Sequence, residues 1–213
     1  MKETIAVINT EGLARTVQEI LSPEVQSASK DCYAIIGTRE PDEAQELIAK
    51  TLAFAIAVIK GKIVRTGGAN GIDTKVMEAT GGRNLEVYLP WNSYNRSSIP
   101  VGAHISVYNP NIHRAWLDSV RIYHPNYDRL SHGATLLHAR NYGIVGGCKG
   151  VVALPGEDGG GGTGQGIRIA KGLKIPLLQA NKGTITDAPR WCGKALQQLG
   201  LADKDLQVTL SGG

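Results

Sequence analysis

The sequence predicts an α/β protein of the Rossmann-like, doubly wound type, with a mostly parallel sheet and helices on both of its faces. Short apolar runs alternate with segments of helical periodicity along the chain, and this alternation is typical of parallel sheets. Two of the apolar runs pass through a glycine-rich turn directly into a helical pattern. Such turns leave bare backbone N–H groups near a helix start, which favours binding of an anion such as phosphate.

The composition indicates a globular protein with room for one α/β domain. The chain has 213 residues, of which 42% are hydrophobic and 20% are charged, so it is long enough to bury a core and too apolar to be disordered. Its net charge of +4 favours anionic partners only mildly, because lysine and arginine are spread along the chain. The basic residues are therefore compatible with two interpretations, an ordinary solvated surface and a binding surface for a polyanion.

Cysteine use and hydropathy predict a cytoplasmic protein. The three cysteines are widely spaced and form no C-x-x-C motif, so we expect reduced, buried or incidental thiols and no metal site. The N-terminal segment is acidic and polar where a secretory signal would be basic and then apolar. The longest apolar run, residues 52–59, is too short to cross a bilayer. We expect a soluble protein without membrane contact and without a cofactor.

The chain divides into an extension, a core and a tail. Residues 1–30 are expected to form an N-terminal extension and linker, with a short strand at 4–8 and a helix at 11–21. The Rossmann-like domain is expected over residues 31–200. Residues 201–213 are expected to form a partly loose C-terminal tail.

Five strands of the core are predicted from short apolar runs that end at glycine, proline or polar residues. The first run, CYAII, leads into Gly37, and the third, LEVYL, is closed by Pro90. Runs of this kind are typical of buried parallel strands. In chain order the predicted strands are 32–36, 62–66, 85–89, 150–154 and 175–179.

Helices are predicted between these strands from apolar residues at three- and four-residue spacing. Pro41 and Asp42 open the first helix and Gly61 ends it, as expected for helix boundaries. Residues 91–112 are expected to be irregular, which in a compact domain usually indicates a functional or mobile loop. The other predicted helices are 72–79, 113–122, 126–142, 164–173 and 188–199.

Two glycine-rich turns lie between a predicted strand and a predicted helix. One is Gly67-Gly68-Ala69-Asn70-Gly71, and the other is the glycine run 159–162, which continues as Thr163-Gly164-Gln165-Gly166. An ordinary strand–helix connection would explain one such turn. Two of them with basic residues beside each predict a single nucleotide-type pocket at the carboxyl ends of neighbouring strands.

These motifs resemble a known family. Ile36-Gly37-Thr38-Arg39, together with the segment VRTGGANGID at 64–73, resembles the "GSR … SGGARGID" signature of DNA-processing protein A (DprA). The segments ARN at 139–141 and GGTGQGIRIA at 161–170 resemble the "RN … GGTGQAIRIA" pattern of small DprA-like proteins, many of them encoded by phages. These proteins belong to the Rossmann-like SLOG superfamily, which also contains the "lonely guy" phosphoribohydrolases. The resemblance covers about residues 32–180.

The resemblance implies a set of ligand-binding residues. Asp73 is open to two interpretations, a contact to a ribose hydroxyl or a helix cap. The arginines would supply permanent positive charge for phosphate. The implied residues are Gly37, Thr38 and Arg39 in the first loop, Gly67, Gly68, Gly71 and Asp73 in the second, Arg140 and Asn141 on a helix, and Gly161, Gly162, Thr163, Gly164, Gln165 and Arg168 at the main anion loop.

One departure from the pattern bears on catalysis. In the phosphoribohydrolases the loop carries a glutamate three residues after the threonine, and that glutamate performs acid–base chemistry. Here Gly166 holds this position, and glycine has no group that can transfer a proton. Glu157 and Asp158 could take over only if the loop folds back. We therefore assign no catalytic residue and expect binding rather than hydrolysis.

Aromatic residues and histidines give further candidates. Trp91 and Tyr94 follow the third strand, where they would either stack on a nucleobase or pack under the long loop. The five histidines lie between residues 104 and 138, without a recognised metal-binding spacing, so ordinary structural roles are expected.

Three functions are compatible with these observations. The leading hypothesis is a DprA-like protein that binds single-stranded DNA or mediates recombination, and the resemblance implies a homo-oligomer. The second is a nucleoside 5'-monophosphate phosphoribohydrolase. The third is a non-catalytic protein that binds or sequesters a small nucleotide signal. For the leading hypothesis, we expect Arg140→Ala to weaken ligand binding without unfolding the domain.

Overall fold

The computed structural model describes residues 31–202. The predicted N-terminal strand and helix lie outside the described residues, as does most of the predicted tail. Within the described range the chain forms a single six-stranded parallel sheet with the strand order β4-β3-β2-β1-β5-β6. The strands are β1 Cys32–Gly37, β2 Ile63–Thr66, β3 Leu85–Leu89, β4 His104–Val107, β5 Gly150–Leu154 and β6 Leu177–Gln179.

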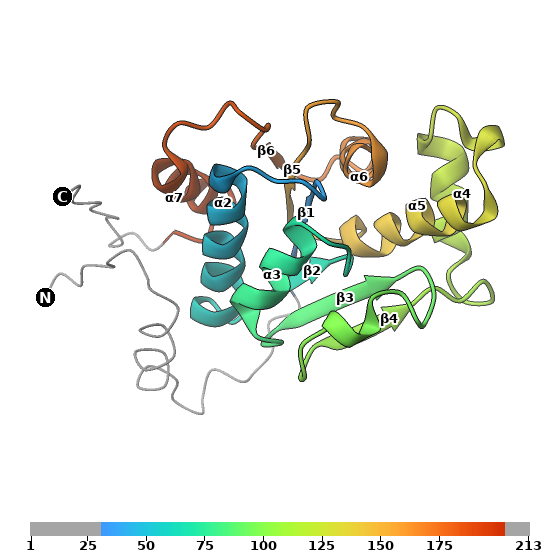
Figure 1. Cartoon of the computed structure of the whole chain (residues 1–213), viewed down its shortest axis with the longest axis horizontal. Coiled ribbons are helices and arrows are strands. Elements are labelled where there is room, and N and C mark those ends of the chain that lie inside the picture. The colour runs from blue at the N-terminus through green and yellow to red at the C-terminus, as the bar shows by residue number, and fades with distance from the viewer. Residues whose placement is uncertain (1–30, 203–213) are drawn as a thin grey trace, which may run out of the picture.

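Helices cover both faces of this sheet, which confirms the predicted fold class (Figure 1). On one face α2, α3 and α7 pack in one hydrophobic cluster, and on the other face α4, α5 and α6 pack in a second. The helices are α2 Glu43–Phe54 with its π-helical continuation η2 Ala55–Ile59, α3 Ile72–Thr80, α4 Arg114–Tyr123, α5 His132–Val145, α6 Gly161–Gly172 and α7 Ala188–Gln198.

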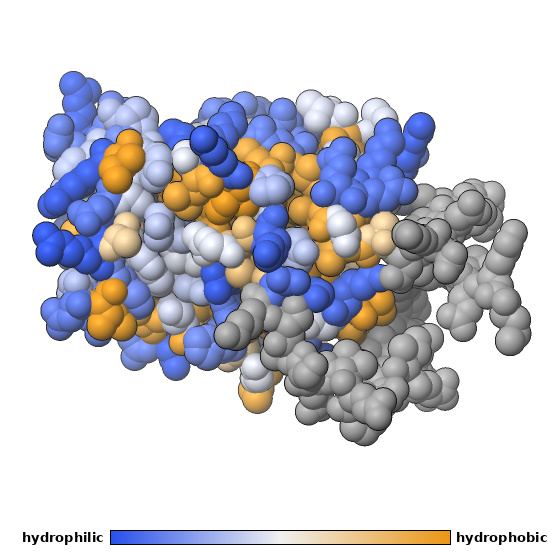
Figure 2. Space-filling view, turned by 180° about the vertical axis from the view of Figure 1, so that it is seen from behind, coloured by the Kyte–Doolittle hydropathy of each residue, from blue (hydrophilic) through white to orange (hydrophobic). Residues whose placement is uncertain are grey.

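The central strands are apolar on both faces because helices bury both of them. In β1, Tyr33 and Ile35 point into the cluster under α2, whereas Ala34 and Ile36 point into the cluster under α5 and α6. The core extends to the end of the described range, where Leu201 packs against the first cluster. The face opposite to the view of Figure 1 gathers apolar residues near its middle (Figure 2).

The structure corrects four predicted boundaries. The segment 91–112 contains the strand β4, which pairs with β3, and the short 3₁₀ helix η3 Arg96–Ser98. The helix predicted over 126–142 begins at His132, because Ser131 caps it by accepting a hydrogen bond from the Ala134 N–H. The last two glycines of the run 159–162 are part of α6, whose first residue is Gly161. The last strand, β6, is shorter than predicted.

No helix within residues 31–202 is long and apolar enough to cross a membrane.

Candidate functional site

The loops that carry the expected ligand residues meet at the carboxyl edge of the sheet. They follow β1, β2 and β5, which are neighbours in the sheet. The chain builds the sheet from β1 towards β4 and later adds β5 on the other side of β1. In open α/β sheets, ligands bind beside such a reversal of strand order. The structure therefore brings the three loops together at the place where this fold binds ligands.

The first two loops touch through their backbones. The Ile72 N–H donates a hydrogen bond of 3.1 Å to the Thr38 carbonyl oxygen. Gly71 has a φ of +80°, and a Cβ on it would collide with the backbone of Thr38 and Arg39. A Cβ on Gly37 would overlap the side chain of Ile72. Both glycines are thus required for the close approach of the two loops, while the Arg39 side chain stays exposed.

Arg140 lies beneath the second loop rather than at the surface. It reaches the loop from α5, and a Cβ on Gly67 would collide with its guanidinium group. The side chain is only 7% exposed, and its Nη1 donates a hydrogen bond of 3.3 Å to the Tyr88 carbonyl oxygen. Its Nε has no hydrogen-bond partner among the described residues. Burial lowers the pKa of Arg140, and the nearby carboxylate of Asp73 opposes this shift.

Asp73 holds the second loop in place from inside. Its carboxylate accepts hydrogen bonds from the Thr66 hydroxyl at 2.8 Å and the Ala69 N–H at 3.0 Å. Gly71, not Asp73, is the N-cap of α3, and no side chain caps that helix. Burial raises the pKa of Asp73, and the Arg140 charge opposes this. The helix-cap interpretation is therefore wrong, and the ribose contact stays a prediction.

The third loop forms the first turn of α6. Gly159 and Gly161 both have a φ of +59°, a conformation that favours glycine. The N-cap, Gly160, provides no side-chain cap, so the first N–H groups of α6 have no partner within the helix. The Asn141 side chain donates a hydrogen bond of 3.0 Å to the Gly162 carbonyl oxygen. Asn141 thereby fixes the helix start to α5, next to Arg140.

Two expected residues of this loop are engaged with other protein groups. The Arg168 guanidinium donates hydrogen bonds of 2.8 Å to the Gln165 side-chain oxygen and to the Tyr123 carbonyl oxygen. Gln165 is fully buried. These contacts join α6 to the end of α4, so Arg168 and Gln165 support the helix, and their contact with a ligand stays a prediction. Thr163 and Gly164 are also buried in the first turns of α6.

The aromatic segment after β3 covers the second loop. The rings of Trp91 and Tyr94 meet edge to face with centroids 5.3 Å apart, and the Arg140 guanidinium lies 5.4 Å from the Tyr94 ring centroid. The Asn95 side chain donates a hydrogen bond of 3.1 Å to the Gly68 carbonyl oxygen. Tyr94 therefore packs under the loop, whereas Trp91 is 38% exposed and offers a free aromatic surface.

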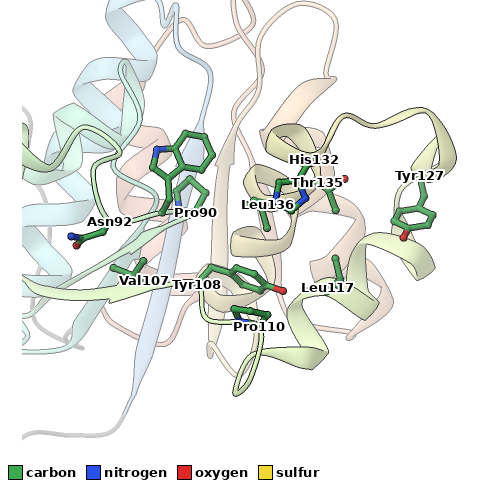
Figure 3. A pocket seen from close by; sticks show the side chains of 11 residues that line it. Pro90, Asn92, Val107, Tyr108, Pro110, Leu117, Tyr127, His132, Thr135 and Leu136 are labelled. Carbon is green, nitrogen blue, oxygen red and sulfur yellow. The ribbon is translucent and has the colours of Figure 1, made fainter.

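A pocket of about 620 Å³ opens beside Trp91. Figure 3 shows its side chains coming from the ends of β3 and β4 on one side and from α4 and α5 on the other. Its lining residues are Pro90, Trp91, Asn92, Val107, Tyr108, Pro110, Leu117, Tyr127, His132, Thr135 and Leu136. Sequence reasoning found only Trp91 among them. Leu136 and Arg140 share one face of α5 at a four-residue spacing, a signal that could have identified the α5 wall.

Three of the five histidines, His113, His124 and His138, form ring contacts. The His124 and His138 rings lie 4.4 Å apart, and the His113 ring stacks on Trp116 at 3.9 Å. The pKa of His138 is lowered to about 4, mainly by burial and to a smaller extent by His124 and the nearby arginines. Within residues 31–202 no cluster of three or more histidine, cysteine or acidic side chains has the arrangement of a metal site.

The position of the missing glutamate leaves no room for one. A Cβ on Gly166 would collide with the Ile36 side chain of β1. The two acidic residues earlier in the loop have partners of their own, one within the loop and one outside it. Asp158 accepts a hydrogen bond of 3.1 Å from the Gly160 N–H, and Glu157 forms an ion pair of 3.7 Å with Lys182. The geometry does not place a carboxylate where the phosphoribohydrolase loop carries its acid–base residue.

Comparison with known proteins places this architecture among solved structures. No protein-family model and no curated protein matches the chain. DNA processing protein A from Helicobacter pylori is similar with a TM-score of 0.54 and 19% identity, over 94% of this chain and 89% of that one. The molybdenum cofactor binding protein from Rippkaea orientalis is similar with a TM-score of 0.50 and 18% identity, over 82% and 88% of the two chains.

A further similar structure is DprA from Streptococcus pneumoniae, with a TM-score of 0.47 and 17% identity, over 79% of this chain and 56% of that one. The similarity to the Helicobacter pylori and Rippkaea orientalis proteins shows a shared fold. The chain therefore has the Rossmann-like fold of DNA processing protein A, as its sequence motifs predict.

Proposed function

We propose that this protein binds single-stranded nucleic acid at the carboxyl edge of its sheet, with phosphate at the glycine loops and a base in the aromatic pocket. The observation that carries the proposal is continuity between these two surfaces. Tyr94 touches both Arg140 under the second loop and Trp91 at the pocket. A phosphate and the base attached to it need an anion site beside an aromatic face.

The anion site combines backbone and side-chain donors. The N–H groups at the start of α6 supply partial positive charge. Arg39 supplies a full, solvent-accessible charge from the first loop, close enough to Arg140 to lower its pKa. Arg140 adds positive potential from beneath the loop. Contacts to the phosphates of a nucleic acid do not distinguish one base from another, so we expect binding with little sequence preference.

The aromatic pocket suits a flat, partly apolar group. Trp91 and Tyr108 present ring surfaces, and the aliphatic wall is formed by Leu117 and Leu136. Stacking of a base on such rings contributes about 1–3 kcal/mol. The Helicobacter pylori protein with this fold binds single-stranded DNA, which agrees with the proposal. The packing of Gly166 on Ile36 favours binding without hydrolysis of a glycosidic bond.

The test is binding of a fluorescent single-stranded oligonucleotide across a salt series. For the wild type we expect affinity that falls steeply with salt, because phosphate contacts release counterions. Arg39→Ala should weaken binding about tenfold and reduce the magnitude of the salt slope by about one. Arg83→Ala is the matched control, since Arg83 is exposed in the turn before β3, at the opposite edge of the sheet.

Equal effects of the two arginine variants would remove Arg39 from the site. Salt-insensitive binding by the wild type would contradict the phosphate contacts altogether. Trp91→Ala tests the second surface, and we expect about tenfold weaker binding with an unchanged salt slope, because a base contact carries no charge.

A second candidate is a protein that binds a free nucleotide or a related small anion. The pocket volume of about 620 Å³ lies within the range of small-ligand pockets. The Rippkaea orientalis protein of this fold binds the molybdenum cofactor. Strong thermal stabilisation by one mononucleotide, without oligonucleotide binding, would favour this candidate. Release of free base from a nucleoside monophosphate would instead establish hydrolysis.

A further inference from the structure

Two cysteines meet at the opposite edge of the sheet. Cys32 is the first residue of β1, and Cys148 lies in the turn between α5 and β5. The Lys149 N–H donates a hydrogen bond of 2.8 Å to the Cys32 carbonyl oxygen, which aligns the two segments. The Sγ atoms of the cysteines are 3.5 Å apart, and both side chains are buried. The backbone pairing of β1 and β5 thus holds the two sulfur atoms within van der Waals contact.

The surroundings of the pair favour a thiolate on Cys32. Contact with the Cys148 sulfur lowers the pKa of Cys32 to about 7, burial opposes this shift, and the Arg65 charge supports it. The carboxylates of Glu86 and Asp31 act in the opposite direction. The same contact with Cys32, together with burial, raises the pKa of Cys148. The Cys148 thiol also donates a hydrogen bond of 3.2 Å to the Ile144 carbonyl oxygen, which favours its protonated form. Cys32 is therefore the better placed of the two to react as a thiolate, which is the reactive form.

A small opening lies beside Gly146, two residues before Cys148. It has a volume of about 290 Å³, and Arg65, Tyr142, Gly143 and Gly146 are among its lining residues. Arg65 donates a hydrogen bond of 3.0 Å to the Gly146 carbonyl oxygen, and the carbonyl oxygen of the next residue, Gly147, is 3.7 Å from the Cys32 sulfur. The chain from Gly146 to Gly147 thus connects the edge of this opening to the Cys32 sulfur.

We propose that Cys32 and Cys148 form an intramolecular disulfide in the presence of a peroxide. The Cys32 thiolate attacks one peroxide oxygen, the O–O bond breaks, and the departing oxygen takes a proton to become water. The Cys32 sulfenic acid is then attacked by the Cys148 sulfur, which forms the S–S bond and breaks the S–O bond. The second oxygen leaves as water with the Cys148 proton. Two thiols are oxidised and one hydrogen peroxide is reduced to two waters.

The third cysteine lies outside this pair. Cys192 is on α7, in the hydrophobic cluster on the other face of the sheet. Burial raises the pKa of its thiol to about 12, so it stays protonated and unreactive at neutral pH. It provides an internal reference for the reaction. The pair also lies at the amino end of β1, away from the loops at its carboxyl end, so oxidation should leave oligonucleotide affinity within about twofold.

The test treats the purified full chain with graded hydrogen peroxide and follows intact mass, free thiols and peptide maps. We expect the mass to fall by two hydrogen atoms, the free thiols to fall from three to one, and Cys32 and Cys148 to appear in one cross-linked peptide. The oxidised protein should melt at a higher temperature, because the link closes a loop between residues 116 positions apart. Reduction with dithiothreitol should reverse each change.

Single-cysteine variants separate the steps. Cys192→Ser should behave as the wild type, and Cys148→Ser should accumulate a sulfenic acid at Cys32 that dimedone traps. Cys32→Ser should give no cross-link, and if it does not fold, the wild-type peptide map and Cys148→Ser decide the question. Gain of oxygen atoms without a cross-link in the wild type, a link to Cys192, or a link between molecules would each overturn the proposal.

Discussion

Arg140 acts on the candidate site from beneath the second loop, where its guanidinium packs against Gly67. Its charge neighbours the buried Asp73, and removing one member of a buried charged couple leaves the other uncompensated. We expect Arg140→Met to lower the free energy of unfolding by about 2 kcal/mol, as measured by urea denaturation. This differs from the loss of binding without unfolding that the sequence suggests for Arg140→Ala.

Arg83→Met is the control for this prediction, because Arg83 is exposed. Its free energy of unfolding should stay within about 0.5 kcal/mol of the wild type. Equal stability of the Arg140 and Arg83 variants would show that the buried charge does not support the loop.

His138 should make the protein less stable in mild acid. Its pKa is about 4 in the folded protein against an ordinary value of 6.5, chiefly because of burial, with His124, Arg168 and Arg140 adding to the effect. Between these two values the unfolded chain binds a proton that the folded chain does not. The free energy of unfolding is therefore highest above pH 6.5, where His138 is neutral in both states, and it decreases as the pH falls towards 4.

His138→Leu removes this titration. From pH 7 to pH 5 the wild type should lose about 1 kcal/mol more free energy of unfolding than the variant, a figure reduced for the partial solvent access of the ring. Urea denaturation at both pH values measures the difference. A His104→Leu variant, altered at an exposed histidine of β4, should retain the wild-type dependence, and a parallel loss in all three proteins would exclude His138 as the source.

The sequence predicts the glycine positions of the site better than its charged ones. Gly37 stands against the Ile72 side chain and Gly71 against the backbone of Thr38 and Arg39. Neither place has room for a Cβ, so the requirement for glycine is visible in the local motif. Arg168 and Gln165 belong to the same kind of motif but turn to each other and to Tyr123 of α4. The residue that a long side chain contacts depends on how distant segments pack, and a local sequence motif carries no information about that packing.

At the level of elements, the start of α6 combines weak helix propensity with a proposed anion site. Gly162 has space around it, because a Cβ added there would lie 3.8 Å from its nearest neighbour, the Asn141 side-chain nitrogen. Gly162→Ala should therefore raise the free energy of unfolding by about 0.5 kcal/mol, because alanine loses less backbone entropy. The added methyl group next to the N–H groups should weaken oligonucleotide binding about threefold.

Gly161→Ala supplies the comparison for this prediction. Gly161 also has open space but has a φ of +59°, so alanine there should lower the free energy of unfolding by about 1 kcal/mol. Thermal melts and oligonucleotide titrations of both variants measure the two effects. A Gly162→Ala variant that binds as tightly as the wild type would place the phosphate away from this helix start.

The elements that sequence reasoning missed are those whose formation depends on a neighbour. His104-Ile105-Ser106-Val107 alternates polar and apolar residues over only four positions, inside a segment rich in turn residues. Its identity as β4 comes from pairing with β3. By contrast, β1, β5 and α2 carry their own signals: two apolar runs, and the Asp42 capping box with Gln45.

At the scale of the whole molecule, the alternation of apolar runs and helical segments is sufficient to predict the doubly wound class. It does not predict the pocket, whose walls come from β3, β4, α4 and α5 together. The expected homo-oligomer stays a prediction, and light scattering on the purified chain at several concentrations tests it. A mass equal to one chain at every concentration would contradict it.

The insertion of β5 beside β1 also determines when the molecule can fold. During synthesis β1 leaves the ribosome early, yet the strand that covers its second edge is made only after β2, β3 and β4. Until then an apolar strand has an open edge, which can pair with other chains. The pairing of β1 with β5 joins segments more than a hundred residues apart, and such long-range pairing is slow. The loop after β5, which carries part of the candidate site, therefore joins the loops after β1 and β2 only when this late pairing has formed.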